Sequence, residues 1–149
     1  MNIKEQLYKK CQEFVENRFQ TIQNTIKEIQ ESLLSETKSS AGDKHETGRA
    51  MLQLEREKAG NQLAEIQKVK ESLSKIHIEK SSETVGLGSV VFTNNLNYFV
   101  GISAGELMVD SVIFYAISAS TPIAQLLLSK KVGDQIQFRN TTFTITELK

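Results

Sequence analysis

Two carboxylates, Asp43 and Glu46, lie three residues apart in the segment SAGDKHETGR at residues 40–49. On the first turn of a helix this spacing puts both side chains on one side. Carboxylate oxygens are preferred ligands of Mg²⁺, but two of them bind it weakly, so a partner would have to supply the remaining ligands. A purely structural role fits as well, with Asp43 as the N-cap of a helix and Glu46 at its third position.

Basic side chains follow the acidic pair. Arg49, Arg56 and Lys58 are candidates for contact with RNA, because such side chains bind phosphate groups. Two glutamates alternate with them, so an ordinary solvated helix face is the other interpretation. His45 lies between the acids, where it can assist proton transfer, bind a metal or simply be solvated.

Cys11 is the only cysteine of the chain, which excludes an internal disulfide and a zinc site of several cysteines. A thiol nucleophile needs a base as partner, and the sequence places neither histidine beside it. We therefore expect Cys11 to be an inert, partly buried residue.

The chain of 149 residues has 18 basic and 18 acidic side chains and a formal net charge of zero. This balance excludes nucleic-acid binding by bulk charge. The start, MNIKEQLYKK, has no apolar run, so we do not expect it to be a secretory signal. Residues 111–129 are uncharged, but Ser118, Ser120, Thr121 and Pro122 interrupt them, so they are not a membrane span. We expect a cytoplasmic protein that has no membrane contact.

The charges divide the chain into two parts. Residues 1–80 hold 14 of the 18 basic and 13 of the 18 acidic side chains, and residues 81–149 hold the other 4 and 5. This predicts a helical part at 1–80 and a compact mixed part at 81–149, with a boundary near 79–84.

The first part has a helical period. Its apolar residues are spaced 4-3-4-3-4, at Val15, Phe19, Ile22, Ile26, Ile29 and Leu33. The pattern stops at small and polar residues and resumes at Leu52, Ala59, Leu63, Ile66, Val69, Leu73 and Ile76. Two helices of roughly 30 residues, each with one apolar stripe, predict an antiparallel coiled-coil hairpin about 45 Å long with its tip at about 36–48. The alternative is a coiled coil that dimerises in trans, against which the break at 35–48 argues, so we expect a monomer.

The second part has β-type segments. They are rich in β-branched and aromatic residues and lie at 85–92, 96–103, 112–118, 135–138 and 142–148. Asn94 and Asn95 predict a hairpin turn. Pro122 predicts the start of a short helix at 123–129, capped by Ser120 or Thr121. We expect an α+β protein whose second part is an antiparallel sheet of about five strands with one helix.

Two motifs carry a resemblance to a family. GDKHETGRAMLQLEREK at 42–58 resembles the tip and returning helix of the bacterial Gre-family transcript cleavage factors (GreA/GreB type). GSVV at 88–91 and ISASTPIAQLLLSKKVGDQIQF at 117–138 resemble the family's Ser-x-x-Ser-Pro-Ile-x-x-x-Leu-x-Gly-Lys-x-x-Gly-Asp signature. The motifs stand in the family's order, and the resemblance covers nearly the whole chain.

The resemblance implies an FKBP-like C-terminal domain that docks at the rim of the RNA polymerase secondary channel. The hairpin would enter the channel, and Asp43 and Glu46 would steady the second Mg²⁺ of the polymerase site near the RNA 3′ end. The polymerase would be the catalyst of RNA cleavage, and this chain would hold no cofactor stably. Docking would use the residues around the start of the short helix: Ser118, Ser120, Thr121 and Pro122.

Two other functions remain open. Some proteins of this architecture enter the same channel without stimulating cleavage, and here Arg49 and Ala50 stand where the family has a Glu-Tyr pair. A coiled-coil adaptor unrelated to polymerase is the third hypothesis.

Overall fold

The structure is a computed structural model that describes residues 2–38 and 43–149, with side chains for residues 2–35 and 47–149. Two long helices precede a sheet with one short helix, so the predicted α+β class is confirmed. Contacts divide the chain into two compact units. We call Val15–Lys70 the helix unit, and Met1–Phe14 with Glu71–Lys149 the sheet unit. The unit boundaries lie within the helices, whereas the composition shifts at 79–84.

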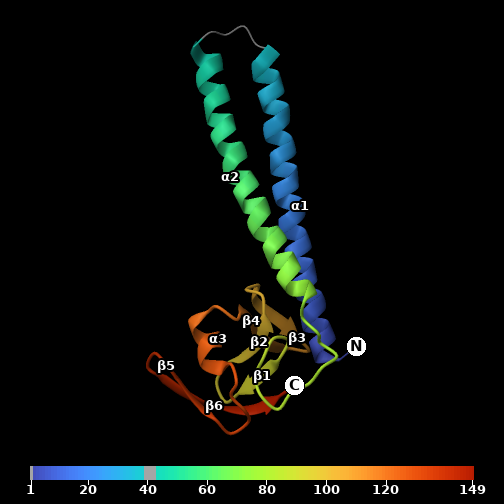
Figure 1. Cartoon of the computed structure of the whole chain (residues 1–149), viewed down its shortest axis with the longest axis vertical. Coiled ribbons are helices and arrows are strands. Elements are labelled where there is room, and N and C mark those ends of the chain that lie inside the picture. Colours follow the sequence, from blue (N-terminus) through green and yellow to red (C-terminus); the bar gives the residue numbers. More distant parts are fainter. Residues whose placement is uncertain (1, 39–42) are drawn as a thin grey trace. The chain divides into compact units, whose positions relative to one another are not determined.

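Helices α1 (Ile3–Lys38) and α2 (Asp43–Ser74) are the long elements seen in Figure 1. Their 36 and 32 residues correspond to about 54 and 48 Å at 1.5 Å per residue. A capping box starts α1. The Asn2 side chain accepts from the Glu5 backbone N–H at 2.9 Å, and the Glu5 carboxylate accepts from the Asn2 N–H at 3.3 Å. These bonds satisfy backbone donors that the helix itself cannot pair.

Within the helix unit, the two helices pack against each other through the predicted apolar stripes. The buried residues of these stripes on α1 and α2 are Val15, Ile22, Ile26, Ile29, Ala59 and Ile66. The ammonium of Lys70 on α2 lies 5.1 Å from the ring centre of Phe19 and 4.0 Å from the Glu16 carboxylate on α1. These cross-helix contacts confirm the antiparallel hairpin within this unit.

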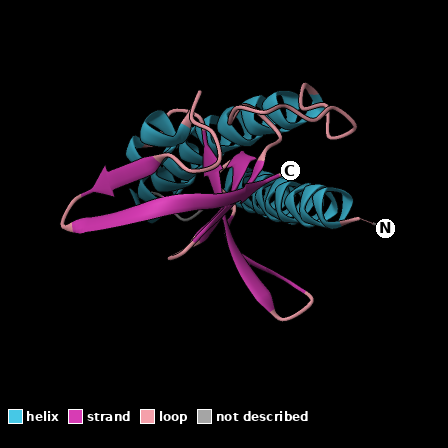
Figure 2. Ribbon diagram, turned by 90° about the horizontal axis from the view of Figure 1, so that it is seen from below, coloured by secondary structure: helices cyan, strands magenta, loops and turns pink. Residues whose placement is uncertain are grey.

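Six strands form one sheet in the order β3-β4-β2-β1-β6-β5. They are β1 (Val90–Thr93), β2 (Asn97–Gly101), β3 (Gly105–Val109), β4 (Val112–Ser118), β5 (Gln135–Phe138) and β6 (Thr141–Leu148). They run in clearly different directions in Figure 2, as the natural twist of sheets produces. Residues 94–96 turn the chain between antiparallel β1 and β2, which confirms the predicted hairpin there.

The sheet differs from the sequence prediction in two respects. It contains β3, which was not predicted, and β2 pairs with β4 in parallel. Strand β3 returns the chain along the outer edge, so β4 can lie beside β2 in the same direction. Asp110 and Ser111 join β3 to β4 with φ of 50° and 66°, a two-residue turn that Asn-Gly usually marks in sequences.

Helix α3 (Pro122–Leu127) packs on the core of the sheet unit through Ile123, Ala124 and Leu127. The core cluster otherwise consists of Val85, Val91, Tyr98, Val100, Ile117, Ile136, Phe143 and Ile145. The predicted short helix is thus confirmed, two residues shorter at its C-terminal end than the sequence suggested.

Candidate functional site

Asp43 is the first residue of α2, and Glu46 lies in the first turn of that helix. The start of a helix favours negative charge, so both acids suit this position on structural grounds alone. Their side chains, and that of His45, lie outside the described residues. The joint use of the two carboxylates therefore stays a prediction.

Arg49, Arg56 and Lys58 do not share one face of α2. Arg49 and Arg56 are seven residues apart and lie on the same side, whereas Lys58 is two residues further and faces nearly the opposite side. Arg56 is half-buried and its guanidinium lies beside Gly60, while Lys58 is exposed. If α2 contacts RNA on one face, Arg49 and Arg56 belong to that contact together.

A groove between the helices of the helix unit is lined by residues of both, among them Glu28, Ile29, Leu52, Glu55 and Lys58. Its volume is about 480 Å³. Lys58 lines this groove together with two carboxylate-bearing residues, Glu28 and Glu55, which favours its role as part of a solvated face.

The residues of the predicted docking segment form one compact turn between β4 and α3. The Ser118 carbonyl accepts from both the backbone N–H and the hydroxyl of Thr121, at 3.1 and 2.8 Å. The hydroxyl groups of Ser118 and Ser120 are 3.0 Å apart. Pro122 follows as the first residue of the helix. The structure thus brings these four residues together in a defined conformation.

Thr121, not Ser120, caps α3. Its backbone is extended, with φ −69° and ψ 151°, and its hydroxyl accepts from the Ala124 N–H at 3.3 Å. Pro122 suits the next position because the first helical N–H has no partner within the helix. This local chemistry fixes the turn without any contribution from a binding partner.

The turn presents a mixed polar and apolar surface. Ser120 and Pro122 are exposed, and Ser118 and Thr121 are half-buried. Leu126, one helical turn after Pro122, is 38% exposed. Sequence analysis did not identify Leu126, although an apolar residue on the outer face of an amphipathic helix was the available signal.

Cys11 is fully buried, and burial raises the pKa of its thiol to about 12. A thiol of this kind is protonated near neutral pH and does not act as a nucleophile. The sequence predicts an inert, partly buried Cys11; the structure buries it fully, and this environment is consistent with an inert thiol. Among the described residues, no three His, Cys, Asp or Glu side chains come together as a metal site.

Comparisons with known proteins find one described likeness, to a solved structure. No protein-family profile matches the chain, and no curated protein matches it. Two chains of known structure do, one of them described as the structure of the transcription factor Gfh1. It is 23% identical, the match covers 95% of this chain and 92% of that one, and the TM-score is 0.35. A likeness at this level says nothing about activity or partners.

None of the helices in the described part of the chain combines the length and the apolar character that crossing a bilayer requires.

Proposed function

We propose that this protein is a transcription elongation factor that binds RNA polymerase through the secondary channel and stimulates cleavage of backtracked RNA. The observation that carries the proposal is the order of three features along the chain. An acidic pair begins the second of two long helices, those helices form a hairpin, and a sheet domain with a capped Thr121-Pro122 turn follows. The two motifs that resemble the Gre family coincide with the start of α2 and with this turn.

Asp43 and Glu46 act as ligands in this proposal, not as an independent catalyst. Two carboxylates leave most of the coordination shell of Mg²⁺ to other groups, which the polymerase site supplies. A metal ion held between two sets of ligands activates water and stabilises the leaving oxygen in hydrolysis of a phosphodiester. The contribution of this chain is to hold two negative charges at the end of the helical hairpin.

The geometry of the helical hairpin makes it narrow enough to enter a channel. The helix unit buries a single apolar seam and exposes polar side chains elsewhere, so it is a pair of helices without further layers. A pair of helices with side chains is about 20 Å wide at most. Such an element can enter a channel that a globular domain cannot. Docking of the sheet unit through Ser118, Ser120, Thr121 and Pro122 would set how far it enters.

The test is a transcript-cleavage assay. Backtracked elongation complexes with 3′-labelled RNA, made with polymerase from the same source, are incubated with Mg²⁺ and the protein. We expect release of short 3′ fragments that the double variant Asp43→Asn/Glu46→Gln abolishes while its binding to polymerase stays within a few fold. The double variant Glu57→Gln/Glu65→Gln removes the same charge from exposed positions further along α2 and serves as the matched control. Full stimulation by the Asp43/Glu46 variant would contradict the mechanism.

A channel-binding regulator that does not stimulate cleavage is the second candidate. Arg49 and Ala50, which replace the family's Glu-Tyr pair beside the acidic tip, favour it because they change the groups next to the RNA 3′ end. Binding to the same backtracked complexes without fragment release would select this function. Absence of binding would contradict both.

A further inference from the structure

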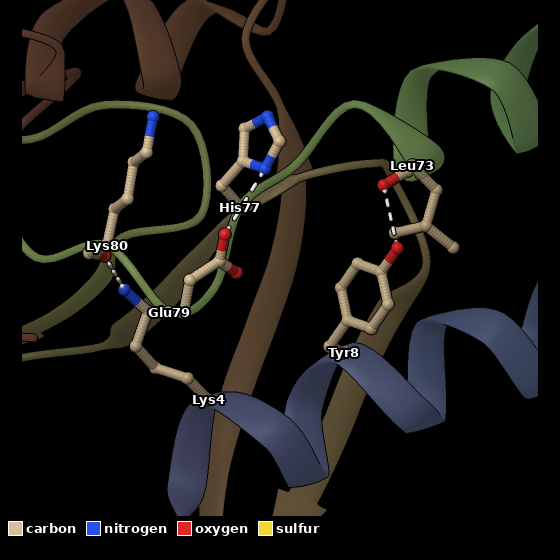
Figure 3. A network of polar contacts seen from close by, with 6 residues as sticks. All are labelled: Lys4, Tyr8, Leu73, His77, Glu79 and Lys80. Atoms are coloured by element: carbon tan, nitrogen blue, oxygen red, sulfur yellow. Dashed lines mark hydrogen bonds and ion pairs between the residues drawn. The ribbon is translucent and has the colours of Figure 1, made fainter.

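A basic pocket lies entirely within the sheet unit, between the start of α1 and the segment that links α2 to β1. Its volume is about 420 Å³. Its lining includes Lys4, Lys75, His77, Lys80 and Ser89. Three lysines and four hydroxyl side chains line it, and no carboxylate does. Figure 3 shows the polar contacts of three of the lining residues, Lys4, His77 and Lys80.

Lys4 is an unusual residue for this position because it is only 8% exposed. Its ammonium donates to the Lys80 carbonyl at 2.8 Å. An ammonium has three N–H donors. Within the described part of the chain, no other acceptor lies within hydrogen-bond distance of this one. Two donors of a buried cation thus remain for a further ligand.

The hydroxyl of Ser89 is a second buried polar group whose hydrogen-bond donor has no partner among the described residues. Ser89 is 6% exposed, and its oxygen accepts from the Gly86 N–H at 2.9 Å. Its hydroxyl proton has no acceptor among the residues that the structure describes. Buried polar groups are normally hydrogen-bonded, so two incomplete groups in one pocket point to a ligand that accepts hydrogen bonds.

The acids near the pocket only partly compensate its positive charge. Glu79 pairs with Nδ1 of His77 at 3.3 Å, and Glu71 pairs with Lys75 at 3.4 Å, in both cases between exposed side chains. Exposed ion pairs of this kind contribute little to stability, because solvent screens the two charges. Burial lowers the pKa of Lys4, and the negative charge of Glu79 opposes this effect. An anion in the pocket would stabilise the charged form of Lys4 further.

We infer that this pocket binds the phosphate groups of a small ligand through Lys4, Lys80 and the hydroxyl side chains around them. Lysine ammonium groups bind phosphate as point charges, and hydroxyls and backbone N–H groups complete such sites. The volume lies within the range of small-ligand pockets, about 300–1,000 Å³, and exceeds what a single phosphate needs. The shared chemistry is a phosphate chain, either inorganic or attached to a nucleoside. This binding is independent of the proposed action on RNA polymerase.

Calorimetric titration of the full chain with pyrophosphate at low ionic strength tests the inference. We expect saturable binding that Lys80→Gln weakens about tenfold, the effect of losing roughly 1.4 kcal/mol of binding free energy. Lys80 is exposed, so this variant keeps the fold, which an unchanged thermal midpoint checks. Lys68→Gln removes a charge from another exposed position, on α2 outside the pocket, and is the matched control.

A parallel titration with ADP distinguishes the two sources of phosphate. Tighter binding of ADP than of pyrophosphate supports a nucleotide ligand, and equal or weaker binding supports an inorganic one. Amide chemical shifts that change at residues 75–89 would locate either ligand in the pocket. Absence of saturable binding of both probes, or equal affinity of the wild type and Lys80→Gln, would overturn the inference.

Discussion

Ile76 packs directly against the backbone of Gly101 in β2. A methyl group on Gly101 would lie 2.8 Å from Cδ1 of Ile76, closer than carbon atoms approach in folded proteins. Ile76 is 6% exposed and follows the end of α2 by two residues. The glycine therefore allows the chain that leaves α2 to lie against the sheet within the sheet unit.

Gly101→Ala is expected to destabilise the sheet unit by about 1–3 kcal/mol, because the added methyl overpacks a buried contact. Urea unfolding measures this change. Gly86→Ala is the matched control, since a methyl at Gly86 would meet nothing within 4 Å.

Ile76→Val supplies the decisive second variant because it removes the Cδ1 atom that the new methyl would meet. Alone, this change costs about 0.5–1.5 kcal/mol. In the double variant with Gly101→Ala, the loss should be smaller than the sum of the two single losses. Simple additivity would show that the contact is not the cause.

The helical part of the fold is predictable because its signal is local. A 4-3-4 apolar spacing follows from the period of the helix, and residues such as Ile22 and Ile29 are buried as expected. The cap at Thr121 and the helix start at Pro122 are also local, since each depends on a few neighbouring residues. The same reasoning places Asp43 at the start of α2 but says nothing about how its side chain lies.

The pairing of the strands depends on residues far apart in the chain, and the sequence patterns did not predict it. Strand β3 has two exposed residues at its start and a charged Glu106, so it lacks the pattern of a buried strand. Strands β2 and β4, which pair in parallel, are separated along the chain by the 10 residues 102–111, and these contain β3. The basic pocket was missed for a similar reason, because Lys4 and Lys80 are 76 residues apart in the sequence.

Gly60→Ala should stabilise the protein by up to about 1 kcal/mol. Glycine inside a helix is less favourable than alanine by roughly this amount, and Gly60 lies within α2. Apart from the backbone of the helix itself, the one atom of the described residues that a new methyl would crowd is Nη1 of Arg56, at 3.0 Å, the end of a flexible side chain. Thermal unfolding measures the gain. A loss of stability instead would show that the guanidinium of Arg56 is held firmly against the helix.

The stability of the protein should fall between about pH 9 and pH 12, in part because of Cys11. The unfolded thiol has its ordinary pKa of 9.0, whereas burial raises the pKa of the folded thiol to about 12. Between these values the unfolded chain loses the proton and the folded chain keeps it, so stability is complete below the first value and declines above it. Urea unfolding across this range measures the slope.

Cys11→Ala separates the thiol from the other groups that titrate in this range. Tyr98 is one of them, since burial and the charge of Tyr115 also raise its pKa. The variant loses stability at neutral pH because it leaves a cavity, but its decline above pH 9 should be shallower than that of the wild type. An identical slope would mean that Cys11 ionises as readily in the folded state as in the unfolded one.

Thr121→Ala should destabilise the sheet unit by about 1 kcal/mol, the usual effect of removing an N-cap hydroxyl. The hydroxyl accepts from the Ala124 N–H and donates to the Ser118 carbonyl, so its loss affects both the helix and the turn. Thr121→Ser keeps the oxygen and should retain most of the stability in urea unfolding. Ser120→Ala tests the alternative cap. Ser120 is exposed, and within the described residues its hydroxyl bonds only that of Ser118, so this variant should change stability by less than about 0.5 kcal/mol. Equal losses for Thr121→Ala and Ser120→Ala would mean that the turn, rather than the cap, supports α3.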